Sequence, residues 1–352
     1  MHRRATVTVV VPCYNYGRYL RQCVASIVDH QPGIDIEVII VDDCSPDGSV
    51  ELARAIAAED GRVRVISHET NRGHIATYND GLAAATGEFV LLLSADDILT
   101  PGALTRGASL MVADERVGLV YGRSVPFVAT PPPARTKESD WIVWPGADWL
   151  RMRCLSGYNV IASPEAMMRT SLLRDFGLYR PDLPHAGDFE MWMRVAAVAD
   201  IGFLVDVDQA YYRQHAANMN VRMFRSGTAE GQLIDIRQRW KAFETVLTGV
   251  GRNLDGADRL LETARRRLGA QALRYVNYAF ARGFRDFPIK EFETFAREIF
   301  PAVGDTAAGR ALARRKRLGM MPVPLHPLWA PSAIGWRLEE TARRWRRSRV
   351  GI

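Results

Sequence analysis

GEFVLLLSADD, residues 87–97, contains a short apolar run that ends in two adjacent carboxylates. The run is too short for a typical helix, which predicts a buried strand over residues 89–93. Asp96 and Asp97 then follow at the carboxyl end of this strand. Because neighbouring carboxylates repel each other and resist desolvation, a divalent cation would relieve both costs. Mg²⁺ and Mn²⁺ prefer oxygen ligands shared between carboxylates and substrate phosphates, so the pair also indicates a diphosphate substrate.

The segments before this stretch alternate between strand-like and helix-like patterns of apolar residues. β-Branched and apolar runs predict strands, and apolar residues at helical spacing predict helices between them. This alternation is typical of an α/β fold with a mostly parallel sheet, in which ligands bind at the carboxyl ends of the strands. The expected strands are residues 6–11, 37–41 and 62–67, and the expected helices are 19–29, 49–57 and 75–85.

The chain after residue 125 is less regular. Residues 126–146 contain five prolines and predict a long loop, of the kind that often covers or binds a substrate. Beyond residue 225 only helical spacing is found. We therefore predict a catalytic domain, a helical extension, and a Pro-rich linker followed by a basic amphipathic tail. The corresponding ranges are 1–224, 225–320 and 321–352, and within the first of them strands are expected at 162–168 and 201–207 and a helix at 188–199.

The amino-acid composition is that of a globular protein with reduced cysteines. The chain has 352 residues, of which 47% are apolar and 24% charged, as in ordinary globular proteins. Its four cysteines are scattered, which argues against a disulfide framework or a zinc cluster and favours reduced thiols. The sequence shows neither a secretory signal nor an apolar run of 18 residues, so a cytoplasmic location without a membrane-spanning helix is expected.

Positive charge is concentrated near the end of the sequence. Residues 301–352 carry eleven Lys and Arg against three Asp and Glu. Between Leu338 and Val350, arginine pairs alternate with Trp345, a pattern that suits peripheral contact with an anionic membrane at its inner face. A solvated helix is the alternative, and no binding of nucleic acid is expected.

Six motifs in a fixed order resemble those of family-2 inverting glycosyltransferases of the GT-A type, over residues 5–220. The resemblance implies a Rossmann-like GT-A sheet and a UDP-, GDP- or dTDP-sugar donor with Mg²⁺ or Mn²⁺. It also implies a glycan, a lipid-linked sugar or a cell-surface polysaccharide as acceptor. The motifs are VVVPCYNYGRYL, EVIIVDDCSPDGS, NRGHIATYNDGLAAATGEFV, LLLSADD, GDFEMWMR and YYRQHAAN.

The resemblance assigns five residues to the donor nucleotide. Pro12 and Tyr14 match positions that hold the base and ribose, and Asp43 matches a carboxylate that accepts a hydrogen bond from a base N–H. Arg72 and Arg213 match residues that meet the nucleotide or its phosphates. The structural alternatives are a strand-ending turn for Pro12 and Tyr14, an Asx-turn or helix cap for Asp43, and a solvated side chain for Arg72.

The resemblance also implies a metal site after the strand over residues 89–93. Asp97 would bind the metal, Asp96 would share the metal or bind the ribose, and His215 would complete the metal site or contact the leaving phosphate. Ser94 stands where the family usually has its first acidic residue. The structural alternative is that the two aspartates cap a helix beginning at residue 98.

Asp188 matches the catalytic base of the family. An inverting transfer needs one carboxylate that removes the proton of the acceptor hydroxyl as it attacks the anomeric carbon. The family often has Glu before this aspartate, where this chain has Gly187, and Glu190 is the second candidate. A carboxylate that stabilises a helix N-terminus is the structural alternative, and Trp192 is expected to serve packing.

Two other functions are compatible with parts of this pattern. A sugar-nucleotide nucleotidyltransferase also uses a parallel sheet and paired carboxylates, but it would need a Gly-rich, basic loop where residues 12–17 read PCYNYG. A protein that binds a nucleotide-sugar without catalysis is suggested only by Ser94 and by Gly187.

Overall fold

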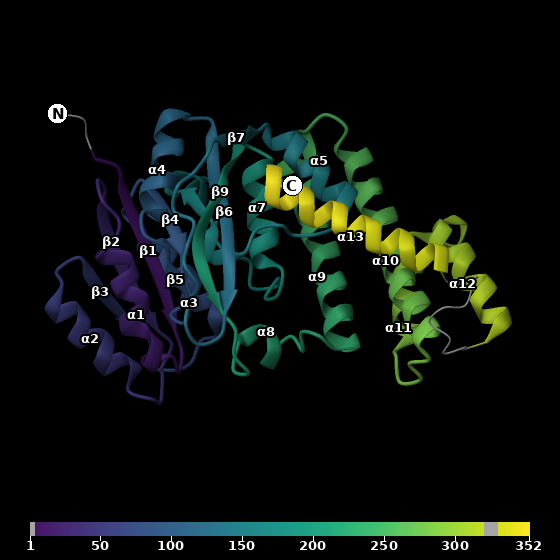
Figure 1. Ribbon diagram of the computed structural model, residues 1–352, viewed down its shortest axis with the longest axis horizontal. Coiled ribbons are helices and arrows are strands. Elements are labelled where there is room, and N and C mark those ends of the chain that lie inside the picture. Colours follow the sequence, from purple (N-terminus) through teal and green to yellow (C-terminus); the bar gives the residue numbers. More distant parts are fainter. Residues whose placement is uncertain (1–3, 320–329) are drawn as a thin grey trace. The chain divides into compact units, whose positions relative to one another are not determined.

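The structure is a computed structural model that describes residues 4–319 and 330–352 (Figure 1). Its residues form two compact units, which are described separately. The first unit contains residues up to 149, residues 159–215 and residues 348–351. The second unit contains residues 150–158 and 216–347, with Ile352.

The first unit is built on one sheet, which has nine strands in the described residues, in the order β3-β2-β1-β4-β8-β6-β9-β5, with β7 paired to β9. The first four strands in the chain are mutually parallel, as predicted. β8 is antiparallel to both of its neighbours, and β5 and β7 are antiparallel to β9. The strands are β1 (Thr6–Cys13), β2 (Asp35–Asp42), β3 (Val63–Ser67), β4 (Phe89–Leu92), β5 (Ile98–Leu99), β6 (Val117–Phe127), β7 (Trp141–Trp144), β8 (Met167–Arg169) and β9 (Asp200–Arg213).

Helices cover both faces of this sheet around β1. Val9 and Val11 pack in a core cluster with Leu20 of α1, whereas Val10 faces Gly81 of α3. Alternate residues of β1 are thus buried on opposite faces, which explains its continuous apolar run. The helices that begin in this unit are α1 (Gly17–Val28), α2 (Ser49–Glu59), α3 (His74–Ala83), α4 (Ala103–Ala113), α5 (Gly146–Ser156), α6 (Thr170–Phe176) and α7 (Gly187–Ala196). The predicted α/β fold class is therefore confirmed.

Two local predictions were wrong. The expected loop over residues 126–146 contains the end of β6 and all of β7, because the apolar sequence WIVW at 141–144 pairs with the free edge of β9. The expected strand over residues 162–168 is instead a 3₁₀ turn (Ser163–Glu165) followed by the three residues of β8. Pro164 lacks the N–H that a central strand requires, which accounts for the turn.

The second unit is helical in the part of the chain that the structure describes, as the spacing predicted. Its long helix α10 packs against α9, α11 and α12. The predicted linker between residues 321 and 331 lies mostly outside the described residues, and the boundary placed at residue 224 stays a prediction. None of the described helices is both long enough and apolar enough to cross a bilayer. The helices are α8 (Met219–Arg222), α9 (Ala229–Thr248), α10 (Ala257–Arg282), α11 (Ile289–Ile299), α12 (Ala307–Leu318) and α13 (Ala330–Val350), with short 3₁₀ turns at Val250–Asn253 and Pro301–Asp305.

Candidate active site

The candidate site lies at the carboxyl ends of the parallel strands. The register between β1 and β2 places Cys13 beside Asp42, so the loops after both strands begin at the same edge of the sheet. The backbone of Pro12 accepts a hydrogen bond from Ala95 N (3.2 Å), which ties the end of β1 to the loop that carries the aspartate pair. Pro12 is buried, whereas the side chain of Tyr14 just after it is 47% exposed. Tyr14 is thus accessible to a planar ligand at this edge.

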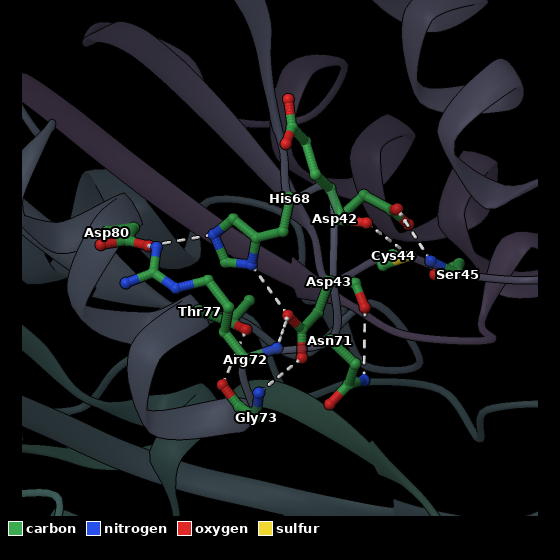
Figure 2. Close-up of polar contacts among 11 residues, drawn as sticks. Asp42, Asp43, Cys44, Ser45, His68, Asn71, Arg72, Gly73, Thr77 and Asp80 are labelled. Carbon is green, nitrogen blue, oxygen red and sulfur yellow. Dashed lines mark hydrogen bonds and ion pairs between the residues drawn. The ribbon is translucent and has the colours of Figure 1, made fainter.

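Asp43 fixes the turn formed by residues 71–73 (Figure 2). Its Oδ1 accepts hydrogen bonds from Arg72 N (2.8 Å) and His68 Nδ1 (2.8 Å), and its Oδ2 accepts one from Gly73 N (2.9 Å). A carboxylate has about four lone-pair sites. Asp43 therefore keeps about one acceptor site for a ligand, because two sites serve the turn and one serves His68.

Arg72 extends from this turn with its side chain 51% exposed and forms an ion pair with Asp80 on α3. The helix-cap alternative for Asp43 does not describe its contacts, because Asp47 is the residue whose carboxylate binds Ser49 N (3.2 Å) at the start of α2. His68 and Asp80 were not among the residues predicted from the sequence. An isolated histidine after a strand carries no signal until its partners are known.

The aspartate pair after β4 meets the end of β9. His215 Nε2 lies 3.0 Å from Asp96 Oδ2, and Asp97 Oδ1 accepts a hydrogen bond from Arg213 N (2.9 Å). The helix-cap alternative for these aspartates is wrong, because residues 98–99 form β5 and α4 begins only at residue 103. The structure thus brings together four of the residues that were predicted for the metal and the diphosphate.

The side chain of Arg213 is buried in a polar and aromatic setting. Its Nε donates to the Asp96 carbonyl (2.9 Å) and its Nη2 donates to Gln22 Oε1 (2.7 Å). The guanidinium carbon lies 4.5 Å from the ring centre of Tyr19 and 4.4 Å from that of Phe127. These contacts hold the guanidinium next to the aspartate pair, so its predicted contact with a phosphate would use only the donor atoms that remain.

The aspartate pair is chemically suited to a hard divalent cation. Burial, and then the neighbouring charge of Asp96, raise the pKa of the Asp97 carboxyl well above its usual range. Within residues 4–319 and 330–352, no three His, Cys, Asp or Glu side chains form a metal-binding group by themselves. Two carboxylates completed by substrate phosphates are, however, a common way of binding Mg²⁺. The residues present therefore fit a cation that is held jointly with a diphosphate.

Asp188 is the second residue of α7 and is partly buried. Its Oδ1 accepts a hydrogen bond from Phe189 N (2.6 Å), and its Oδ2 lies 3.4 Å from both Asn159 Nδ2 and Ser163 Oγ. Burial raises the pKa of the Asp188 carboxyl to about 6, although these hydrogen bonds and the charge of His185 act in the opposite direction. A carboxylate with a pKa near neutrality is suited to accept a proton.

Glu190, the second candidate for the base, is occupied elsewhere. Its carboxylate forms a buried ion pair with Arg194 (3.0 Å), one turn further along α7. Arg194 in turn donates to the backbone carbonyls of residues 176–178, so the pair holds the segment before α7. Trp192 is 1% exposed, which confirms its expected role in packing.

Helix α3 connects the two halves of the candidate site. Asn79 makes two hydrogen bonds with the backbone of Tyr179 (2.8 and 2.9 Å), and His74 Nε2 contacts the Pro184 carbonyl (2.9 Å). These contacts hold the segment before α7 against α3. Burial, followed by the charges of Asp188, Asp96 and Asp97, raises the pKa of the Tyr78 hydroxyl. Tyr78 therefore lies within electrostatic reach of both the candidate base and the aspartate pair.

Comparison of the sequence with known families identifies the domain. Residues 8–177 match the family described as "Glycosyl transferase family 2". This match spans a little under half of the chain and supports a family-2 glycosyltransferase domain there. Among curated relatives, glycosyltransferase GlyG of Streptococcus pneumoniae is 42% identical over 93 residues, which are 26% of this chain and 31% of GlyG. Succinoglycan biosynthesis protein ExoO of Rhizobium meliloti is 36% identical over 127 residues, or 34% and 36% of the two chains. The matches thus span about a third of each relative.

Solved structures resemble most of this chain in fold. S. aureus TarS 1-349 in complex with UDP has a TM-score of 0.56 and 19% identity, with 89% of this chain and 91% of that chain covered. The mannosyltransferase PcManGT from Pyrobaculum calidifontis, in complex with GDP-Man and Mn²⁺, has a TM-score of 0.52 and 18% identity, with 85% and 88% covered. At these identities the likeness shows the shared fold, including the predicted GT-A sheet.

Proposed function

We propose that this protein is an inverting glycosyltransferase that moves a sugar from a nucleoside-diphosphate donor to a hydroxyl group of an acceptor. The observation that carries the proposal is a carboxylate separate from the aspartate pair: burial raises the pKa of Asp188, and Asn159 and Ser163 lie beside its Oδ2. The match of residues 8–177 to glycosyl transferase family 2 and the names of the relatives support glycosyl transfer in general. ExoO is named for the biosynthesis of a polysaccharide, which supports a glycan, a lipid-linked sugar or a cell-surface polysaccharide as acceptor.

In this mechanism Asp188 acts as the general base. Its carboxylate takes the proton of the acceptor hydroxyl while the acceptor oxygen bonds to the anomeric carbon of the donor sugar. The bond between that carbon and the diphosphate oxygen breaks, and the nucleoside diphosphate leaves. Because attack and departure occur on opposite faces, the configuration inverts. Asn159 and Ser163 hold the carboxylate in place for this transfer.

The other half of the site binds the donor. Tyr14 and the turn fixed by Asp43 would hold the base and ribose, and Arg72 and Arg213 would meet the phosphates. Asp96 and Asp97, with His215 beside them, would hold Mg²⁺ or Mn²⁺ together with the diphosphate. When bound, such a cation would neutralise the charge that develops on the leaving diphosphate.

Replacement of the base tests this proposal. Donor turnover is measured with UDP-, GDP- and dTDP-sugars in wild-type protein and in Asp188→Asn. Loss of a general base lowers the rate by about 10²- to 10⁴-fold. Asp182→Asn, which changes an exposed aspartate paired with Arg180, is the matched control and should keep full activity. Full activity in Asp188→Asn, or no turnover by wild-type protein with any donor and metal, would show that the proposed reaction is wrong.

We also propose that α13 lies on an anionic membrane surface. Glu339 forms ion pairs with Arg267 and Arg274, and the guanidinium of Arg343 lies 4.0 Å from the ring centre of Tyr158. These contacts attach one side of α13 to the rest of the second unit. Three exposed apolar side chains form a stripe along another side of α13, because spacings of four and seven residues place them on the same side of a helix. They are Ile334, Leu338 and Trp345, with exposed fractions of 57, 66 and 62%.

This stripe is flanked by exposed arginines, a combination that suits the interface of a bilayer rich in anionic lipid. Sedimentation with vesicles measures the contact, using phosphatidylcholine alone and with phosphatidylglycerol. The double variant Leu338→Glu/Trp345→Glu should lose binding to the anionic vesicles, whereas Val128→Glu, an equally exposed apolar position in the first unit, should not. Equal binding by all three proteins, or displacement by an oligonucleotide alone, would contradict this role.

A further inference from the structure

His68 lies between two carboxylates in the turn region of the candidate donor site (Figure 2). Its Nδ1 is 2.8 Å from Asp43 Oδ1, and its Nε2 is 2.9 Å from Asp80 Oδ2. The three side chains come from separate elements: Asp43 follows β2, His68 follows β3, and Asp80 lies on α3. The histidine therefore links the end of the sheet to the helix that begins at the turn.

The two contacts place a carboxylate oxygen at each ring nitrogen. An ionised carboxylate can only accept hydrogen bonds, so beside two ionised carboxylates both ring nitrogens would donate. Asp43 also accepts from Arg72 N and Gly73 N, and Asp80 also accepts from the guanidinium of Arg72. Donation from both nitrogens would make the ring a doubly protonated, positively charged imidazolium.

The charges of this group balance only in that state. Asp43 and Asp80 contribute two negative charges, and Arg72 and a charged His68 contribute two positive charges. With a neutral ring, one nitrogen would present a lone pair to a carboxylate oxygen at hydrogen-bonding distance, which is repulsive. The His68 side chain is 5% exposed and that of Asp43 is 4% exposed, so water could relieve little of this cost. His74, at the start of α3, is the other titratable group of this region within reach of the Asp43 charge.

We propose that His68 is the positioning residue of the donor site, acting as an imidazolium that locks the turn of residues 71–73. It touches neither substrate nor metal. It holds the Asp43 carboxylate against the backbone of the turn, and through Asp80 it sets the direction in which Arg72 extends. Donor affinity then depends on the charge of a buried histidine. This proposal rests on the proposed function, because it takes the turn to be where the nucleotide binds.

Nuclear magnetic resonance of ¹⁵N-histidine-labelled full-length protein tests the ring directly. At pH 7 the signals of His68, assigned by their absence in His68→Gln, should have the imidazolium pattern, with both nitrogens protonated. The pattern of a neutral tautomer would overturn the proposal. In Asp80→Asn, which removes one negative charge from a partly exposed position, the ring should shift toward a neutral tautomer. This second variant decides the question if His68→Gln does not fold.

Donor binding separates positioning from a purely structural role. The dissociation constant of UDP, GDP and dTDP is measured by calorimetry for wild-type protein, His68→Gln and the control His30→Gln, which changes an exposed histidine elsewhere. His68→Gln keeps a donor near Asp80 but loses the charge, and it should weaken nucleotide binding about tenfold or more. In turnover the donor KM should rise by a similar factor while kcat changes less than about threefold. Unchanged nucleotide affinity in a folded His68→Gln would overturn the positioning role, whereas the absence of any nucleotide binding in wild-type protein would instead refute the proposed function.

Discussion

Asp188→Asn should change stability in a way that depends on pH. Burial raises the pKa of this carboxyl from 3.8 to about 6 in the folded protein, so the folded state holds the charged form at a cost. The cost is absent below pH 3.8, where the group is protonated in both folded and unfolded chains. It grows between pH 3.8 and 6, and it is constant above pH 6, where the group is ionised in both.

The size of the effect follows from the same two values. At 1.36 kcal/mol per pH unit, a rise from 3.8 to about 6 corresponds to about 3 kcal/mol of lost stability at pH 8. At pH 4.5 the cost is only about 1 kcal/mol by the same linkage relation. Asparagine carries no charge and avoids this cost at every pH. Its amide nitrogen would face the donors Asn159 and Ser163, which subtracts roughly 1 kcal/mol per lost hydrogen bond at all pH values.

Urea unfolding of wild-type protein and Asp188→Asn at pH 4.5 and pH 8 measures this difference. The variant should gain about 2 kcal/mol relative to wild-type protein between the two pH values, whatever constant offset the lost hydrogen bonds add. The second unit is the same in both proteins, so its contribution cancels in the comparison. Asp182→Asn, at an exposed position, should show no such change. A difference between wild-type protein and Asp188→Asn that is the same at both pH values would refute the idea that this carboxylate is held charged at a cost.

Three further predictions concern pH, metal and packing. The rate of transfer should fall about tenfold per pH unit below pH 6, since only ionised Asp188 can act as base, and a flat profile between pH 4.5 and 7 would contradict that role. Exhaustive chelation of metal should abolish transfer, and added Mn²⁺ or Mg²⁺ should restore it. In calorimetry, Asp97→Asn should bind UDP equally with and without metal. Transfer that survives chelation would exclude the metal-binding role of Asp96 and Asp97. Gly81→Ala should lower the free energy of unfolding by about 1–3 kcal/mol, because its new methyl group would clash with a methyl group of Val10. Gly335→Ala, where a new methyl group would meet no atom within 4 Å, should be neutral or stabilising in urea unfolding.

The parts of the fold that follow a repeating pattern could be predicted from the sequence. Most residues of β1, β2 and β4 are buried, and their continuous apolar runs identified them. β7 could not be predicted, because its four residues become a strand only through pairing with β9, which is distant in sequence. The proline-rich stretch before it gave the opposite signal. Pairing with an edge strand is a tertiary effect that overrides local propensity.

In the candidate site too, residues in sequence motifs could be predicted, whereas residues defined only by tertiary contacts could not. Residues in ordered motifs were predicted, and the structure groups Asp96, Asp97, Arg213 and His215 as expected. The residues that hold the predicted side chains in place were missed. His68 and Asp80 lie beside Asp43 and Arg72, Asn159 and Ser163 lie beside Asp188, and Gln22 lies beside Arg213, and none of them carries a pattern of its own. Their partners lie between 8 and 191 positions away in the sequence. Such supporting contacts depend on how the helices pack, which a single sequence does not specify.

Ser94, where this chain departs from the family pattern, can be understood from its backbone. Its carbonyl accepts hydrogen bonds from Asp97 N (2.9 Å) and from the Cys23 thiol (3.6 Å), so residue 94 shapes the turn whatever its side chain. A third carboxylate there would add negative charge beside Asp97, whose pKa is already raised by burial and by Asp96. Serine thus lowers the repulsion within the turn at the expense of one potential ligand. The remaining pair would rely more strongly on the diphosphate to complete the coordination of a cation, so metal and donor should bind this site together rather than separately.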